Sequence, residues 1–210
     1  SGGYASPMMK IAIFLIALTI PAVAQDAVEV PGQPRHATTD ALGRHMFNAM
    51  ASGNFEQARN ATALRLTRKE IGQLFEAIIE RIAKGQAGNP NQGPNLLELR
   101  EHLAKSERLD KEFKKMREKS EPKFRKAFDA IRAHAKAEQI DWNNVKYLKT
   151  DDSKVRKGNE IPFEEGDLTV HFSANGRQYR LLIEDAANTP LWGWMGGPNP
   201  LQLQPLKGEK

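Results

Sequence analysis

The stretch from Leu168 to Ile183 constrains the fold of this chain most, because its pattern is that of a β-hairpin. Apolar side chains occupy every second position on both sides of a turn: Leu168, Val170, Phe172, Tyr179, Leu181 and Ile183. Asn175-Gly176 is the expected turn, since both residues accept positive φ. A two-residue turn pairs Phe172 with Tyr179 and places all six apolar side chains on one face. The same register pairs His171 with Arg180 on the opposite, polar face.

Two neighbouring segments are typical of further strands, which are needed because a lone hairpin is only marginally stable in water. Residues 144–149 (NVKYLK) precede the hairpin, and residues 191–195 (LWGWM) follow it after a turn at Asn188-Thr189-Pro190. We therefore predict an antiparallel meander of three to four strands over residues 141–195. Residues 196–210 contain three prolines and are predicted to form an extended tail.

The N-terminal half of the chain has the helical period of 3.6 residues in place of the strand period of 2. One helix is expected to begin near Thr39 or Asp40 and to end at Ser52-Gly53-Asn54. The next begins with a capping box, in which Thr67 accepts from a free backbone N–H and Glu70 reaches back. Its apolar stripe consists of Ile71, Leu74, Phe75, Ile78, Ile79 and Ile82.

Two charged helices are predicted after a polar loop at residues 86–95. One runs from residue 96 to about residue 119, and Ser120-Glu121-Pro122 starts another with proline in its first turn. Residues 100–136 contain 13 Lys and Arg but only 7 Asp and Glu. Interspersed charges are typical of a solvated helix, and the alternative is a face that binds anionic head groups, envelope polymers or an acidic partner. Nucleic acid is not expected, because no aromatic side chains interleave these charges to stack on bases.

The order of the elements, helices first and an antiparallel meander last, predicts an α+β fold. We expect about four N-terminal helices over residues 40–140, packed on the C-terminal meander of residues 141–195 as one domain. This order, the break at residues 52–56 and the hairpin ending near Trp192 resemble secreted domains of the cystatin-like and nuclear transport factor 2-like kind. The resemblance implies helices against the concave face of a curved sheet, in a superfamily that contains both enzymes and binding modules.

Residues 8–24 (MMKIAIFLIALTIPAVA) have the features of a secretory signal peptide. One lysine precedes an apolar run that closes on the small-x-small site Ala22-Val23-Ala24. The run is too short for a membrane span, which needs roughly 20 residues. We expect cleavage near Ala24-Gln25, with residues 1–7 upstream of the natural start and residues 25–39 as a flexible lead-in. The mature protein is then secreted or periplasmic and has no transmembrane segment.

The sequence also excludes several kinds of chemistry. The chain has no cysteine, which rules out disulfides, thiol catalysis and cysteine zinc sites. None of the five histidines has the i, i+4 spacing of a helical zinc site. A nucleophile elbow, a phosphate-binding P-loop and a dinucleotide fingerprint are missing as well. No metal or cofactor is therefore expected.

The polar face of the hairpin carries the candidate ligand-binding residues His171 and Arg180. An exposed strand face is the simplest interpretation of this pair. If a pocket covers that face, His171 could act as an acid or base with a nearby carboxylate such as Asp167 or Glu184. Perturbed histidines in pockets are typical of catalytic sites, so His171 is the one candidate catalytic residue.

Trp192 and Trp194 are the other candidate ligand-binding residues. They are separated by Gly193 and are expected to share one strand face. Tryptophan is usually well buried, so core packing is one interpretation. The other is a stacking surface for a sugar or a partner protein, with Gly193 allowing a ligand or another backbone to approach closely.

Together these features favour a non-enzymatic binding or interaction module of the periplasm or cell exterior. Its partner would be a protein or an anionic component of the cell envelope. One alternative is a small cone-shaped α+β enzyme that uses His171 with a carboxylate. The other is an envelope-associated structural protein that binds anionic polymers through its basic helices.

Overall fold

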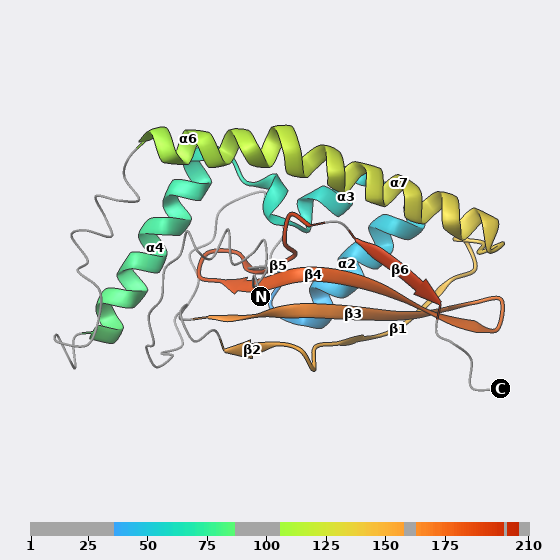
Figure 1. Cartoon of the computed structure of the whole chain (residues 1–210). Coiled ribbons are helices and arrows are strands. Elements are labelled where there is room, and N and C mark those ends of the chain that lie inside the picture. The colour runs from blue at the N-terminus through green and yellow to red at the C-terminus, as the bar shows by residue number, and fades with distance from the viewer. Residues whose placement is uncertain (1–35, 87–105, 158–162, 200, 206–210) are drawn as a thin grey trace, which may run out of the picture.

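The computed structural model describes residues 36–86, 106–157, 163–199 and 201–205. Helices occupy the first half of this part and a curled antiparallel sheet occupies the second, so the predicted α+β class is confirmed. Figure 1 shows a long helical rod running along the sheet, with a shorter helix beneath it. The predicted signal peptide and most of the lead-in lie outside the described residues. No helix of the described part is long and apolar enough to be a membrane span.

The first helices begin and end where short-range signals predict. Helix α2 (Thr39–Ser52) begins after Thr38, whose hydroxyl accepts a backbone N–H, and ends at Gly53 with φ of 70°. Left-handed φ at this position is what glycine supplies without steric cost. Helix α3 (Phe55–Asn60) follows at once, because the side chain of Asn54 caps its first turn.

The predicted capping box is present at the next long helix. A 3-10 turn, η1 (Ala63–Arg65), leads into helix α4 (Arg68–Gln86). The backbone N–H of Glu70 donates to Thr67 Oγ1 at 3.2 Å, and the backbone N–H of Thr67 donates to the Glu70 carboxylate at 2.7 Å. Two backbone donors that the helix itself cannot satisfy are thereby paired.

The two charged helices are continuous, which corrects the predicted restart at Ser120-Glu121-Pro122. Helix α6 (Ser106–Lys115) passes through a π turn, η2 (Met116–Ser120), into helix α7 (Glu121–Ala137). The N–H of Glu121 donates to the carbonyl of Met116, five residues earlier. Proline lacks an N–H and crowds the carbonyl four residues back in an α-helix. The π turn changes that bonding pattern just before Pro122, so the helix continues.

The sheet contains six strands within the described part of the chain. They are β1 (Lys146–Asp151), β2 (Arg156–Lys157), β3 (Glu164–Ala174), β4 (Arg177–Thr189), β5 (Gly193–Met195) and β6 (Gln202–Pro205). The long strands β3 and β4 form the centre, and all pairings are antiparallel. Strands β1 and β2 pair with the outer side of β3, whereas β5 and β6 pair with the outer side of β4.

The hairpin register is the predicted one. Phe172 lies opposite Tyr179, and His171 lies opposite Arg180. The turn residues Asn175 and Gly176 have φ of 51° and 71°, as a two-residue turn of this type requires. The pattern of apolar side chains and the chemistry of the turn therefore agree on one register.

The last part of the chain differs from the predicted extended tail. Strand β6 pairs with β4, with Leu203 opposite Leu181 and Gln204 opposite Arg180. The alternation in residues 201–204 (LQLQ) is short and runs into Pro205, which disfavours a strand in sequence-based reasoning. Proline is tolerated here because β6 lies at the edge of the sheet and needs partners on one side only.

One face of the central hairpin forms the core with the helices. Phe172 stacks on Tyr179 and Trp142, with ring centroids 5.5 Å and 5.7 Å apart. Helix residues pack against the same face, among them Leu42, Met46, Met50, Phe124, Phe128 and Ile131. The described helices therefore cover this face, and alternate side chains of β3 and β4 point to the opposite one.

Candidate functional site

A row of basic side chains crosses the face of the sheet that lies opposite the described helices. In β3, His171 lies between Lys149 of β1 and Arg180 of β4, and Arg180 in turn lies opposite Gln204 of β6. Directly opposed residues of antiparallel strands point to the same side, and like charges in such positions destabilise a sheet. The sequence predicts the pairing of His171 with Arg180. Lys149 joins them because β1 shifts its register between Tyr147 and Lys149.

A small polar pocket of about 210 Å³ is lined by His171 and Arg180 of this row and by Gln204. The lining comes from strands β1, β3, β4 and β6 and from the turn after β1. It consists of Asp151, Ser153, Lys154, Thr169, His171, Arg180, Leu182 and Gln204. Hydroxyl, amide and charged groups therefore converge on one space, with a single aliphatic side chain among them. Few but well-placed polar groups are what fix the orientation of a small ligand.

Two nitrogen atoms of this pocket are buried without a hydrogen-bond partner, His171 Nε2 and Arg180 Nε. The nearest carboxylate oxygen to His171 Nε2 is Asp151 Oδ2 at 4.0 Å, which is too far for a hydrogen bond. Leaving a buried polar atom unpaired costs about 1–3 kcal/mol. Such an atom in a native pocket therefore calls for an explanation, and a bound ligand is one.

The electrostatics of the pocket favour a neutral imidazole beside cations. Burial lowers the pKa of His171 below its usual range, and the charges of Lys149 and Arg180 add to this while Asp151 opposes it. The N–H of Ser153 donates to Asp151 Oδ1 at 2.9 Å and lowers the pKa of that carboxyl. At neutral pH the pocket thus presents an uncharged His171, an ionised Asp151 and the permanent charge of Arg180.

The carboxylate beside His171 is Asp151, which corrects the predicted partners Asp167 and Glu184. Asp167 accepts from the N–H of Asp185 at 3.1 Å, and Glu184 accepts from the Gln202 side chain at 2.7 Å. Both carboxylates are therefore used in holding the end of β4 and the start of β6. Asp151 could not be predicted from the sequence, because the register shift in β1 decides which side chains of that strand face the pocket. The described residues include no group of three or more metal-ligating side chains suited to an ion.

Trp192 and Trp194 are core residues, so the predicted stacking surface is absent. Their exposed fractions are 0% and 4%. The two indoles also belong to different clusters, since Trp192 packs with Leu66 and Met195 whereas Trp194 joins the main core. Another group does approach Gly193 closely, as expected, and this group is a backbone segment.

That backbone belongs to His36, which the sequence assigns to a flexible lead-in. A Cβ on Gly193 would lie 2.5 Å from the carbonyl oxygen of His36, so only glycine fits. The His36 carbonyl accepts from the N–H of Trp194 at 2.8 Å, and His36 Nδ1 lies 3.0 Å from the Trp194 carbonyl. The imidazole is 4% exposed, and its edge faces His45 with ring centroids 4.9 Å apart. His36 is therefore a structural anchor between the chain before α2 and strand β5.

No protein-family model, curated protein or solved structure matches this chain.

Proposed function

We propose that this protein is a binding module that holds a small anionic ligand in the pocket around His171 and Arg180. The observation that carries the proposal is the pair of buried, unpartnered nitrogen atoms in one polar pocket, His171 Nε2 and Arg180 Nε. A carboxylate or phosphate group between them would accept from both once His171 takes up a proton. Charge-assisted hydrogen bonds of this kind are among the strongest that a protein makes.

The cation row supports an anion over a neutral ligand. The charges of Lys149 and Arg180 lie on either side of His171, and both lower the pKa of its imidazole. Asp151 offsets only part of this charge, and Lys154, which also lines the pocket, is paired with Asp167 at 3.9 Å. An anionic ligand would complement the positive charges of Lys149 and Arg180. Electrostatic complementarity therefore favours its binding.

A phosphate titration followed by NMR tests the pocket. Inorganic phosphate and acetate are expected to shift the imidazole signals of His171, and Arg180→Gln is expected to weaken phosphate binding at least about tenfold. The reason is that a hydrogen bond to a charged group contributes about 1.5–3 kcal/mol. The bound anion should also raise the pKa of His171, since it favours the protonated imidazole.

Arg177→Gln is the matched control for this titration. Arg177 is an exposed residue of the same strand, lies at the turn end of β4 and carries the same charge. Its replacement is expected to leave phosphate affinity within about twofold, because a screened surface charge contributes little. The proposal would be contradicted if both variants lost phosphate affinity equally. It would also be contradicted if neither phosphate nor acetate shifted the imidazole signals of His171.

We further propose that the module is exported and is built like the secreted cystatin-like domains. The signal-peptide features of residues 8–24 and the placement of helices before a curled sheet support this. Expression from Met8 in a bacterium with a periplasm is expected to yield a periplasmic protein that begins at Gln25, as read by mass spectrometry. An uncleaved chain confined to the cytoplasm would overturn the export part and leave the anion pocket unaffected.

A further inference from the structure

In the rod formed by α6, η2 and α7, some carboxylates contact neighbouring helices, whereas several lysines face the solvent. Two of its carboxylates, Asp110 and Glu121, pair with arginines of neighbouring segments. Glu121 binds Arg117 at 2.8 Å and Arg59 of α3 at 2.9 Å. Asp110 pairs with Arg68 of α4 in the same way. These two carboxylates hold the rod to the domain, whereas the exposed Glu118 pairs with Lys114 on the outer side of the rod.

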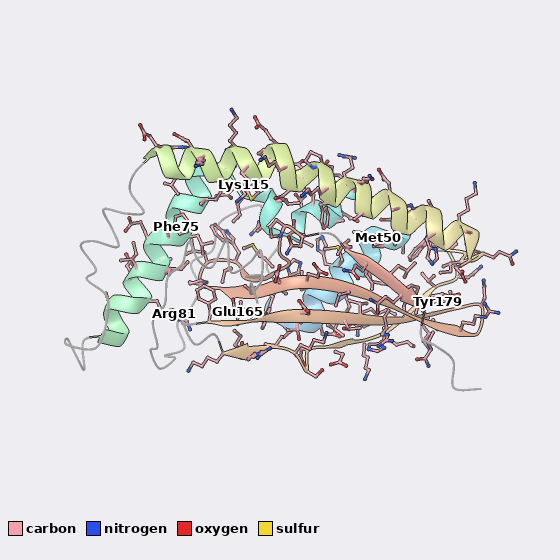
Figure 2. All side chains as sticks on the ribbon, in the orientation of Figure 1. Met50, Phe75, Arg81, Lys115, Glu165 and Tyr179 are labelled. Atoms are coloured by element: carbon pink, nitrogen blue, oxygen red, sulfur yellow. The ribbon has the colours of Figure 1, made fainter. Side chains whose placement is uncertain are left out.

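Four of the exposed lysines between residues 111 and 126 of the rod form what we call the lysine row: Lys111, Lys119, Lys123 and Lys126. None of them makes an ion pair with another described residue. The exposed carboxylates Glu107 and Asp129 lie beyond the two ends of the row. Figure 2 shows long side chains standing out from the rod on the side away from the sheet.

The π turn is expected to keep the lysine row straight. Residues spaced by four along an α-helix drift around its axis, because one turn takes 3.6 residues. A π turn winds the chain less per residue, so we expect η2 (Met116–Ser120) to return Lys119 towards the line of Lys111. Phe124 and Phe128, which pack into the core, fix the inner side of α7, and Lys126 lies opposite them. Single π turns are frequent at functional sites, which favours a role for this alignment.

We infer that the lysine row binds a linear anionic polysaccharide, one bearing carboxylate or sulfate groups along its length. The charges from Lys111 to Lys126 extend over about 22 Å at the helical rise of 1.5 Å per residue. They form a line and do not converge on one point, so they suit a chain of charges better than a small anion. This site is separate from the His171 pocket, which lies on the opposite face of the sheet.

Two other anionic partners fit the rod less well. A helix that binds a membrane surface inserts an apolar face, whereas the apolar face of α7 is buried in the core. The one large exposed apolar side chain of the described residues is Leu148, in β1. Single-stranded nucleic acid is recognised by stacking on aromatic side chains, and the lysine row has none beside it.

Binding of a size-selected heparin fragment tests the inference. Replacing the lysine row by glutamine is expected to weaken heparin binding at least about tenfold, and to lower the salt dependence by roughly one unit of slope per lysine. The matched control replaces four exposed cations elsewhere by glutamine, with the same loss of charge: Lys69, Lys146, Lys157 and Arg177. That variant should bind heparin within about twofold of the unmodified protein, as should Arg180→Gln.

A footprint on the unmodified protein gives an independent measurement. Acetylation of exposed amines, read by mass spectrometry, is expected to slow at the lysine row when heparin is bound and to stay unchanged at Lys146 and Lys157. Equal losses of heparin affinity in the two four-residue variants would overturn the inference, and so would uniform protection of all lysines. Either result would show that heparin binding depends only on the net charge of the protein. Tighter binding to single-stranded DNA or to anionic phosphatidylglycerol vesicles than to heparin would overturn the choice of a polysaccharide.

Discussion

Replacing Gly43 by alanine is expected to lower the free energy of unfolding by about 1–3 kcal/mol, the usual range for an overpacked core. An added Cβ would lie 1.9 Å from Thr150 Oγ1 and 3.1 Å from Val170 Cγ2. Gly43 is thus the point where α2 approaches the sheet most closely. Thr150 cannot turn away freely, because its hydroxyl is hydrogen-bonded to the Tyr147 hydroxyl at 2.6 Å.

Urea unfolding of paired variants measures this effect. Gly72→Ala is the matched control, since Gly72 lies in helix α4 and an added Cβ there meets nothing within 4 Å. This control should gain about 0.5–1 kcal/mol, the helix-propensity difference between glycine and alanine. The double variant Gly43→Ala/Thr150→Ala should recover part of the loss by removing the closest clash. A Gly43→Ala protein as stable as the Gly72→Ala protein would refute the close packing of α2 on β1 and β3.

Acidification is expected to destabilise the protein through His36. Burial lowers the pKa of His36 from 6.5 to about 4, while its hydrogen bond to Trp194 opposes the shift and the nearby His45 and Arg65 reinforce it. Between pH 6.5 and about pH 4, His36 is protonated in the unfolded chain but neutral in the folded chain. Stability is therefore full above pH 6.5 and falls as the pH decreases towards 4. The loss from this group amounts to about 3 kcal/mol, since one pKa unit corresponds to about 1.4 kcal/mol.

The His36→Asn variant isolates this contribution. Asparagine can still donate to the Trp194 carbonyl but does not titrate, so the pH dependence due to residue 36 disappears. Unfolding free energies at pH 7, 5.5 and 4 are to be compared for the two proteins, and the difference between them should shrink or reverse as the pH falls. A constant difference across this range would show that His36 takes up its proton equally in both states.

Much of the local structure could be predicted from the sequence, because its causes lie within a few residues. Asn175-Gly176 and the alternating apolar residues beside it determine the hairpin register. Thr67 and Glu70 determine the start of α4 through hydrogen bonds across one helical turn. In the candidate site, the same short-range logic places His171 opposite Arg180.

The remaining features depend on contacts between distant segments. Strand β6 exists because β4 offers it an open edge, although its own sequence is a weak strand signal. Trp192 and Trp194 share a short segment but are buried in different clusters by residues far along the chain. Periodicity carries no information about either outcome, since it reports which side of an element is apolar and not what will cover it.

The sequence by itself determined the α+β order, the central hairpin and the pairing of His171 with Arg180, since each follows from local hydrogen bonding and alternation. Only the tertiary structure decided that Asp151 lines the pocket with them and that Lys149 lies opposite His171, because both depend on the register shift in β1. It likewise decided that the two charged helices are continuous, because a π turn joins them where the residues Ser120-Glu121-Pro122 predict a restart.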